Sequence, residues 1–185
     1  MTGRLVLVVG PSGAGKDSIL RYAMAHFAGD ARFVFPRRCV TRAADAAAED
    51  HESLDERAFD ELAGQGGFAL MWEAHGLKYG VRWEIDEHLR DGRVVAVNVS
   101  RTILAEALHR YPTAAVVEIA ASSEIRAARI AARGRETAAD IMQRIGRNVP
   151  PKSSKLQPAI IHNNGSLTEA GQDFCRLLEG FAPAL

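Results

Sequence analysis

Short apolar segments alternate with helical patterns along this chain. The first apolar segment, Leu5 to Val9, is continuous and rich in valine, which is typical of a strand buried on both faces of a parallel sheet. A helix is expected from Gly15 to about Phe27. Further apolar runs occur at Phe33 to Phe35, Val94 to Val99, Ala114 to Ile119 and Ala159 to His162. This alternation predicts an α/β fold with a largely parallel central sheet.

Hydroxyl and carboxylate residues three positions apart mark three expected helix starts. In this spacing the two side chains satisfy the free backbone amides of the first helical turn. The pairs are Ser53 with Glu56, Thr137 with Asp140 and Ser166 with Glu169.

Two segments interrupt the pattern of the core. Residues 37–92 are polar and glycine-rich without a clear βα period, and they are expected to form an inserted substrate-binding subdomain. Residues 126–155 are rich in arginine and end in a segment with two adjacent prolines, as expected of a lid and its hinge. The prediction is a single domain over 1–185 with its core in 1–36, 93–125 and 156–185.

Composition restricts the classes of partner. The chain has 185 residues, and its 23 basic side chains balance its 23 acidic ones. No net field therefore favours nucleic acid or an anionic membrane, and neither is expected as a partner. The two cysteines, Cys39 and Cys175, fit neither a metal site nor a disulfide scaffold, and no apolar run approaches membrane-spanning length. We therefore expect a soluble, cytoplasmic protein.

A glycine-rich loop lies between the first strand and the first helix. Glycines let backbone amides converge on phosphate oxygens, the helix N-terminus adds partial positive charge, and Lys16 can reach the outer phosphates. The alternative is a glycine-rich turn without a nucleotide, which the spacing of Gly10, Gly15 and Lys16 disfavours. The loop residues expected to bind a nucleoside triphosphate are Gly10, Pro11, Ser12, Gly13, Ala14, Gly15, Lys16, Asp17 and Ser18.

Asp17 departs from the usual form of this loop. The lysine is normally followed by Ser or Thr, whose hydroxyl binds Mg²⁺, but here Asp17 comes first and Ser18 second. A carboxylate is a hard oxygen ligand, so one interpretation keeps Asp17 as the metal ligand. In the other, Asp17 only stabilises the positive end of the helix.

Basic residues gather in the insertion. Because arginine binds phosphate oxygens in bidentate fashion, this group suggests a concave anion site, although a solvated charged surface is the alternative. The residues are Arg37, Arg38, Arg42, Lys78 and Arg82, with Tyr79 beside them.

The order of motifs resembles guanylate kinase over nearly the whole chain. The motifs are the phosphate loop, Val40-Thr41-Arg42, Gly76-Leu77-Lys78-Tyr79-Gly80, Arg133-Gly134 and Asn163-Asn164. The resemblance implies a three-layer P-loop kinase fold with a central parallel sheet. Guanine recognition does not match, because Leu70 stands where guanylate kinases have a base-reading carboxylate. Asp45 stands in place of a second arginine, and Asn98-Val99-Ser100 in place of an acidic pair.

A narrower resemblance accounts for these departures. Five segments of the chain resemble those of ribose 1,5-bisphosphate phosphokinases. They are the loop through Asp17-Ser18, Tyr79-Gly80-Val81, Asn98-Val99-Ser100-Arg101, Arg133-Gly134-Arg135-Glu136 and Asn163-Asn164-Gly165-Ser166-Leu167. That resemblance implies ATP-dependent phosphorylation of the 1-phosphate of ribose 1,5-bisphosphate in phosphonate use, giving 5-phosphoribosyl 1-diphosphate. A substrate with a phosphate at each end and no base needs cations at two places and no purine-reading carboxylate.

These motifs suggest roles for individual residues. We expect Lys16, Asp17 and Arg144 to be catalytic, with ATP and Mg²⁺ as cofactors and Asp17 as metal ligand. The resemblance implies that Arg133 stacks on adenine, that Arg144 clamps the transferring phosphoryl group, and that Asn164 contacts the nucleotide. From the placement of charge we expect the sugar phosphate, a small-molecule substrate, to meet Arg38, Arg42, Lys78 and Tyr79 at one end and Arg101 at the other. A short signature shared with the family implies a contact with His51.

Two other functions stay open at this point. One is a nucleoside monophosphate kinase with altered base preference, and the other is a catalytically inactive guanylate kinase-like binding module. The sequence does not decide the oligomeric state, for which a homodimer is one option.

Overall fold

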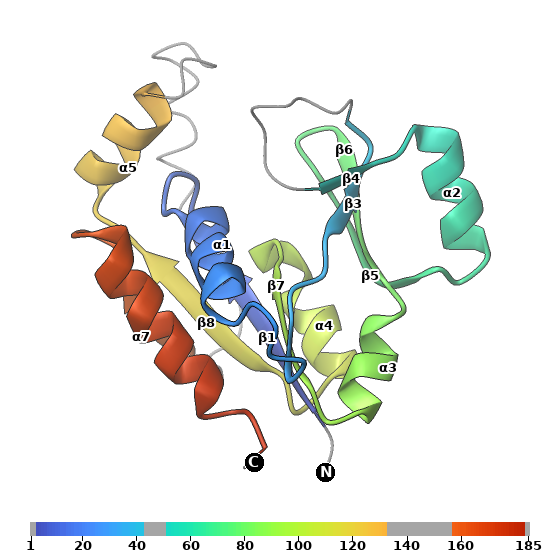
Figure 1. The fold of residues 1–185 in the computed structure, drawn as a ribbon. Coiled ribbons are helices and arrows are strands. Elements are labelled where there is room, and N and C mark those ends of the chain that lie inside the picture. The colour runs from blue at the N-terminus through green and yellow to red at the C-terminus, as the bar shows by residue number, and fades with distance from the viewer. Residues whose placement is uncertain (1–2, 43–50, 133–156, 184–185) are drawn as a thin grey trace.

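The computed structural model describes residues 3–42, 51–132 and 157–183. Its main sheet has five strands in the order β2-β7-β1-β8-β9, and every neighbouring pair is parallel. The strands are β1 (Arg4–Val9), β2 (Phe33–Val34), β7 (Val94–Asn98), β8 (Ala115–Ala120) and β9 (Ala159–His162). Helices cover this sheet on both sides, which confirms the α/β class (Figure 1).

Alternate residues of β1 belong to two separate cores. Val6 and Val8 pack with α1 (Lys16–His26) and α7 (Leu167–Glu179) on one face of the sheet. Leu5, Leu7 and Val9 pack on the other face with α3 (Ile85–Arg90) and α4 (Leu104–Arg110). Because side chains alternate along a strand, a continuous apolar run fills both cores at once.

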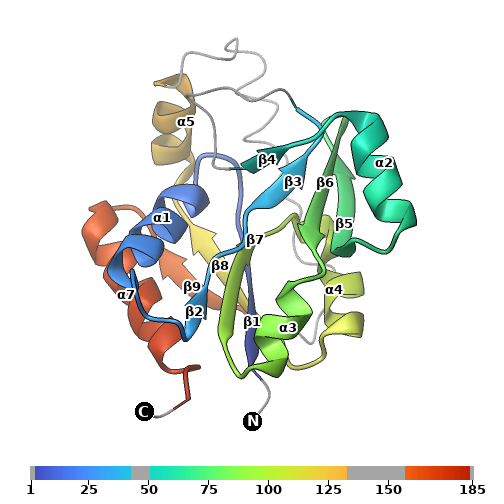
Figure 2. The ribbon, with the colours of Figure 1, turned by 45° about the vertical axis from the view of Figure 1, so that its right-hand side comes forward.

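A second sheet of four strands stands beside the main one, in the order β4-β3-β6-β5 (Figure 2). Its strands are β3 (Arg38–Val40), β4 (His51–Ser53), β5 (Phe68–Ala74) and β6 (Leu77–Arg82). Helix α2 (Glu56–Gly64) packs on it through Phe59, which stacks on Phe68 at 4.6 Å between ring centroids. All of these elements lie within the polar segment 37–92.

The expected boundaries agree closely with the observed ones in the main sheet. The helix expected from Gly15 to about Phe27 is α1, with Gly15 as its N-cap and Phe27 as its C-cap. The capping box at Ser166 and Glu169 is present, with both hydrogen bonds formed.

The expected cap at Ser53 and Glu56 is wrong. Ser53 ends strand β4, and Asp55 caps α2 by accepting a hydrogen bond of 2.7 Å from the amide of Ala58. Asp55 directly precedes the first helical residue, so its carboxylate reaches the first-turn amides, whereas the Ser53 backbone is held in the sheet. The expected cap at Thr137 and Asp140 lies outside the described residues.

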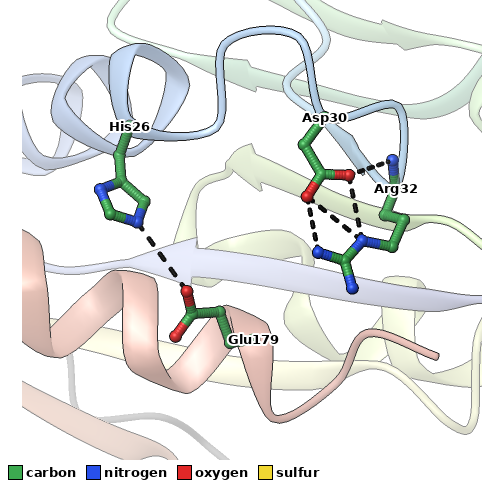
Figure 3. Close-up of polar contacts among 4 residues, drawn as sticks. All are labelled: His26, Asp30, Arg32 and Glu179. Atoms are coloured by element: carbon green, nitrogen blue, oxygen red, sulfur yellow. Dashed lines mark hydrogen bonds and ion pairs between the residues drawn. The ribbon is translucent and has the colours of Figure 1, made fainter. Parts of the chain in front are cut away.

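Helices α1 and α7 lie side by side (Figure 1). Polar contacts occur at and just beyond their C-terminal ends (Figure 3). Nε2 of His26 lies 3.8 Å from Oε1 of Glu179, which links the last turns of the two helices. Just beyond α1, the carboxylate of Asp30 accepts hydrogen bonds from both the backbone and the guanidinium of Arg32. These contacts join the C-terminal end of α1 to α7 and fix the turn toward β2.

The carboxyl ends of the main strands meet at one edge of the sheet. Strand β1 leads into the phosphate loop, β7 into Val99 to Arg101, and β9 into Asn163. This edge is where α/β proteins commonly bind ligands, because the loops that follow the parallel strands converge there. Among the described helices, none is long and apolar enough to cross a bilayer.

Candidate active site

The glycine-rich loop connects β1 to α1 with Lys16 folded over it. The Lys16 ammonium donates hydrogen bonds to the carbonyls of Gly10 at 2.9 Å and Pro11 at 3.2 Å. The N-cap Gly15 has φ 91°, a left-handed conformation that residues with a side chain rarely adopt. The loop thereby places a cation and a helix N-terminus together, which is the arrangement that binds phosphate oxygens.

The rear of the loop is braced by segments from the C-terminal half. Asn163 is buried and donates a hydrogen bond of 2.7 Å to the Ala14 carbonyl, which also accepts a weaker bond of 3.5 Å from Arg129. A Cβ built on Gly13 would lie 2.8 Å from the Arg126 carbonyl, so α5 (Ser123–Ala131) packs directly against the loop. Glycine is required there because a side chain would collide with that backbone.

Asp17 lies where the loop meets the second sheet. Its Oδ1 accepts a hydrogen bond of 2.8 Å from the side-chain amide of Asn98 at the end of β7. The same oxygen is 3.6 Å from Nη2 of Arg38 on β3. The carboxylate therefore joins the phosphate loop, the main sheet and the second sheet.

A cleft of about 470 Å³ is lined by residues of the phosphate loop, of β7 and of the second sheet. Eight of its lining residues are among those expected from the sequence: Gly10, Pro11, Ser12, Lys16, Asp17, Arg38, Tyr79 and Arg101. The rest of its wall comes from the ends of β5 and β7: Trp72, Glu73, Ala74, His75, Asn98, Val99, Ser100 and Thr102. The cleft thus has the phosphate loop at one side and the second sheet at the other.

Two aromatic rings form the wall on the second sheet. Trp72 and Tyr79 are cross-strand neighbours whose rings stack at 5.3 Å with planes 6° apart. The guanidinium carbon of Arg38 lies 6.0 Å from the Tyr79 ring centroid, within the range of a cation–π contact. This stack fixes the Tyr79 ring beside Arg38.

Arg101 is held in place by a carboxylate from the next strand. Its Nη2 donates a hydrogen bond of 2.5 Å to Oε1 of Glu118 on β8, and the Arg101 side chain is only 12% exposed. Ser100 caps the short 3-10 helix η1 (Arg101–Ile103) by accepting from the amide of Thr102 at 3.2 Å. The guanidinium consequently has a defined position in the cleft wall.

Lys78 faces away from the cleft. Its ammonium binds Asp60 of α2, with a closest distance of 2.6 Å, and this hydrogen bond raises the pKa of Lys78. Since consecutive residues of a strand point to opposite faces, Lys78 and Tyr79 lie on different sides of the second sheet. Lys78 is not among the residues that line the cleft.

The other basic residues of the insertion also lie outside the cleft lining. Arg82 binds Glu52, and this contact lowers the pKa of Glu52. Arg37 donates a hydrogen bond of 2.7 Å to the His51 carbonyl. His51 itself is buried, with its Nε2 3.2 Å from the Ser53 hydroxyl. Arg42, one residue beyond Thr41 at the end of the second sheet, is likewise absent from the lining.

The remaining expected residues fall into two groups. Asn164 accepts a hydrogen bond of 2.8 Å from the amide of Ser122, the N-cap of α5. The remaining residues of the loop and of the first turn of α1 do not line the cleft: Gly13, Ala14, Gly15 and Ser18. Arg133 and Arg144 lie outside the described residues.

Sequence reasoning missed the roles of three structural partners of the site: Trp72, Glu118 and Asn163, the last of which was noted only as part of a motif. Trp72 on β5 lies directly opposite Tyr79 on β6. Its spacing of two residues from Ala74 could have indicated that Trp72 and Ala74 share one face of the strand. Glu118 and Asn163 contact residues that are distant in the sequence, so no local pattern indicates their partners. Leu70, which stands where the resemblance to guanylate kinase implies a base-reading carboxylate, is buried in the core and is not among the residues that line the cleft.

Comparison with known proteins places these features in a family. No family model matches the chain. The chain is 51% identical over 170 residues to the ribose 1,5-bisphosphate phosphokinase PhnN of Methylobacterium radiotolerans, covering 92% of this chain and 94% of that protein. It is 42% identical over 180 residues to the enzyme of the same name from Brucella melitensis, covering 97% and 94%.

The solved structures that it resembles share the fold at low identity. Guanylate kinase from Anaplasma phagocytophilum superposes with a TM-score of 0.68 at 17% identity, over 97% of this chain and 86% of that one. A sugar kinase from Janibacter superposes with a TM-score of 0.55 at 15% identity, over 98% and 99%. The fold is therefore that of guanylate kinase. With its identity to the curated relatives, this shows that the chain belongs to the ribose 1,5-bisphosphate phosphokinase family.

Proposed function

We propose that this protein transfers the terminal phosphoryl group of ATP to the 1-phosphate of ribose 1,5-bisphosphate, giving 5-phosphoribosyl 1-diphosphate and ADP. The observation that carries the proposal is the shared cleft. It holds a phosphate loop with Lys16 on one side and Arg38, Tyr79 and Arg101 on the other. The names of the close relatives supply the acceptor.

The donor side of the cleft binds the nucleotide phosphates. Backbone amides of the loop and the N-terminus of α1 face the phosphate oxygens, and the Lys16 ammonium exchanges its carbonyl contacts for the outer phosphates. These groups hold the triphosphate in line and spread its charge before transfer.

The acceptor side binds a base-free sugar phosphate. Arg38 and Arg101 offer guanidinium groups to phosphate oxygens, and the Tyr79 hydroxyl can donate a further hydrogen bond. The buried position of Leu70 leaves the cleft without the carboxylate that guanylate kinases use for guanine at that position. A substrate without a base loses nothing by this change, whereas guanine would lose the carboxylate that binds it at that position.

The transfer itself needs few chemical groups. An oxygen of the acceptor phosphate forms a bond to the γ-phosphorus, and the bond from that phosphorus to the β,γ-bridging oxygen breaks, so ADP leaves with the electron pair. Because the attacking phosphate is ionised near neutral pH, no side chain has to remove a proton. Catalysis consists of positioning and charge neutralisation by the loop and the arginines.

Asp17 fits a role as magnesium ligand. Mg²⁺ in kinases is held by one or two carboxylates together with phosphate oxygens and water, and Asp17 brings one carboxylate to the cleft wall next to Lys16. When bound, Mg²⁺ neutralises charge on the phosphate oxygens. Arg133 and Arg144 remain proposals for adenine stacking and for clamping the phosphoryl group.

The test is product formation from alternative acceptors. Protein, ATP and Mg²⁺ are incubated with ribose 1,5-bisphosphate, GMP, dGMP, AMP or UMP, and the products are detected by mass. We expect 5-phosphoribosyl 1-diphosphate as the main product, its loss in Lys16→Met, and its retention in Arg57→Met, whose guanidinium pairs with Glu61 on the exposed face of α2. Turnover of GMP alone would instead identify a nucleoside monophosphate kinase, and absence of ATP binding an inactive module.

A further inference from the structure

The carboxylate of Asp17 at the start of α1 and the amide of Asn98 at the end of β7 form a hydrogen-bonded pair. Asn98 is the buried last residue of β7. Its Nδ2 donates a hydrogen bond of 2.8 Å to Oδ1 of Asp17. The residues are 81 positions apart, but Asn98 lies opposite Val8 in the parallel register, directly below the phosphate loop. Both residues line the cleft.

In many phosphate-loop enzymes the same two places carry other groups. There a Ser or Thr follows the loop lysine, an Asp stands at the end of a strand, and the two hold Mg²⁺ together. Here the carboxylate follows the lysine and a neutral side chain ends the neighbouring strand. The pair still has one negative charge and one hydrogen-bonding neutral group, but their positions are exchanged.

We propose that Asn98 is a positioning residue for Asp17 and that this exchanged pair is the magnesium-binding unit of the protein. The inference rests on the proposed function, since it assumes that ATP binds at the loop. The amide of Asn98 engages one oxygen of Asp17 and so fixes the plane of the carboxylate at the cleft wall. Hydrogen bonds of this kind orient metal ligands and are worth about 10–100-fold in metal affinity.

The exchange also explains why Asn rather than Asp ends β7. The amide N–H of Asn98 donates to the Asp17 oxygen, whereas an ionised carboxylate at this position could only accept and would repel it. Nη2 of Arg38, at 3.6 Å from the same Asp17 oxygen, balances a single negative charge at this point. An amide at position 98 therefore suits a chain that already has a carboxylate at position 17.

The test compares the wild type with Asp17→Ser, Asn98→Ala and the double variant Asp17→Ser/Asn98→Asp, which restores the common arrangement. ATP binding is measured by calorimetry with Mg²⁺ and with EDTA, and Mn²⁺ binding by electron paramagnetic resonance, both without acceptor. We expect metal-dependent ATP binding in the wild type, a loss of about 10–100-fold in metal affinity in Asn98→Ala, which removes the orienting hydrogen bond, and at least as large a loss in Asp17→Ser. The double variant should recover most of that loss.

Two results would overturn the inference. One is a double variant that binds metal no better than Asp17→Ser, and the other is wild-type ATP affinity that is equal with Mg²⁺ and with EDTA. Because Asn98 is buried, thermal unfolding is recorded for every variant. Full retention of metal affinity in a folded Asn98→Ala variant would contradict a positioning role.

A matched control separates lost stability from lost metal binding. Tyr111→Phe removes the 2.6 Å hydrogen bond from the Tyr111 hydroxyl to Asp86, neither of which lines the cleft, so its metal dependence should equal that of the wild type. The proposed function is judged separately by product formation. If the wild type makes no 5-phosphoribosyl 1-diphosphate but the double variant recovers metal affinity, only the proposed function is disproved. If the wild type makes that product but its metal affinity does not depend on Asp17 or Asn98, only this inference is disproved.

Discussion

The side-chain amide of Asn163 donates a 2.7 Å hydrogen bond to the carbonyl of Ala14, 149 positions earlier in the chain. Asn163 follows β9, the outermost strand of the main sheet, and its side chain is 2% exposed. The phosphate loop is thus held from behind by the far edge of the sheet rather than by its own glycines alone.

Replacing Asn163 should weaken both the fold and nucleotide binding. Asn163→Ala leaves the Ala14 carbonyl without its strongest described partner, which costs about 1–3 kcal/mol for a buried group. Urea unfolding and ATP calorimetry measure the two effects. Tyr111→Phe is the control, expected to lose stability with unchanged ATP affinity. Equal ATP affinity in both variants would show that the brace does not shape the loop.

Two glycine-to-alanine substitutions should have opposite effects. A Cβ at Gly15 would lie 2.4 Å from Nδ2 of Asn163 at a backbone φ of 91°, so Gly15→Ala should lower Tm and abolish ATP binding. Gly64, the last residue of α2, has no atom within 4 Å of the corresponding position. Gly64→Ala should therefore stabilise the protein by about 0.5–1 kcal/mol, as read from calorimetric unfolding. Similar losses in the two variants would contradict this.

Arg38 and Lys78 should differ in their effect on the acceptor. Arg38 lines the cleft, whereas the Lys78 ammonium binds Asp60 on the opposite face of the second sheet. We expect Arg38→Met to raise the KM for ribose 1,5-bisphosphate by about tenfold or more, the value of one hydrogen bond to a charged group. Lys78→Met should change it much less. The KM values are measured by steady-state kinetics at saturating ATP. A larger increase in KM for Lys78→Met than for Arg38→Met would show that the acceptor binds on the other face of the second sheet.

The Asp30 carboxylate should contribute a pH-dependent part of the stability. Hydrogen bonds from the Arg32 guanidinium and backbone lower the pKa of Asp30 below its ordinary value of 3.8. The folded state therefore binds the proton less tightly than the unfolded chain, so the contribution is present above the ordinary pKa and is lost as pH falls below it. Wild type should exceed Asp30→Asn in Tm near pH 7, and the difference should shrink in acid. A difference that does not vary with pH would contradict this.

The sequence was most informative where structure follows from local pattern. Continuous apolar runs located the strands of the main sheet, since such a strand fills two cores, and the loop motif located the nucleotide side of the cleft. Strands β3 and β4 are three residues long, too short to show a period. The cap of α2 was misplaced because Ser53 and Asp55 both suit that role, and only the sheet contacts of β4 decide between them.

The acceptor side of the cleft was harder to predict for a geometric reason. Charge alone grouped Arg38, Lys78 and Arg82, but strand alternation and pairing send their side chains to different neighbours. The contacts of Asn98 with Asp17 and of Glu118 with Arg101 each join a strand to the start of a helix that lies beside it only after folding. No local pattern in the chain encodes such pairs.

The position of β9 in the sheet has a consequence for synthesis. The asparagine that secures the phosphate loop is made 149 residues after its partner Ala14. A nascent chain therefore carries an unsecured loop until Asn163 has emerged. Competence to bind ATP should appear as a late and abrupt event during translation, once β9 has joined the edge of the sheet.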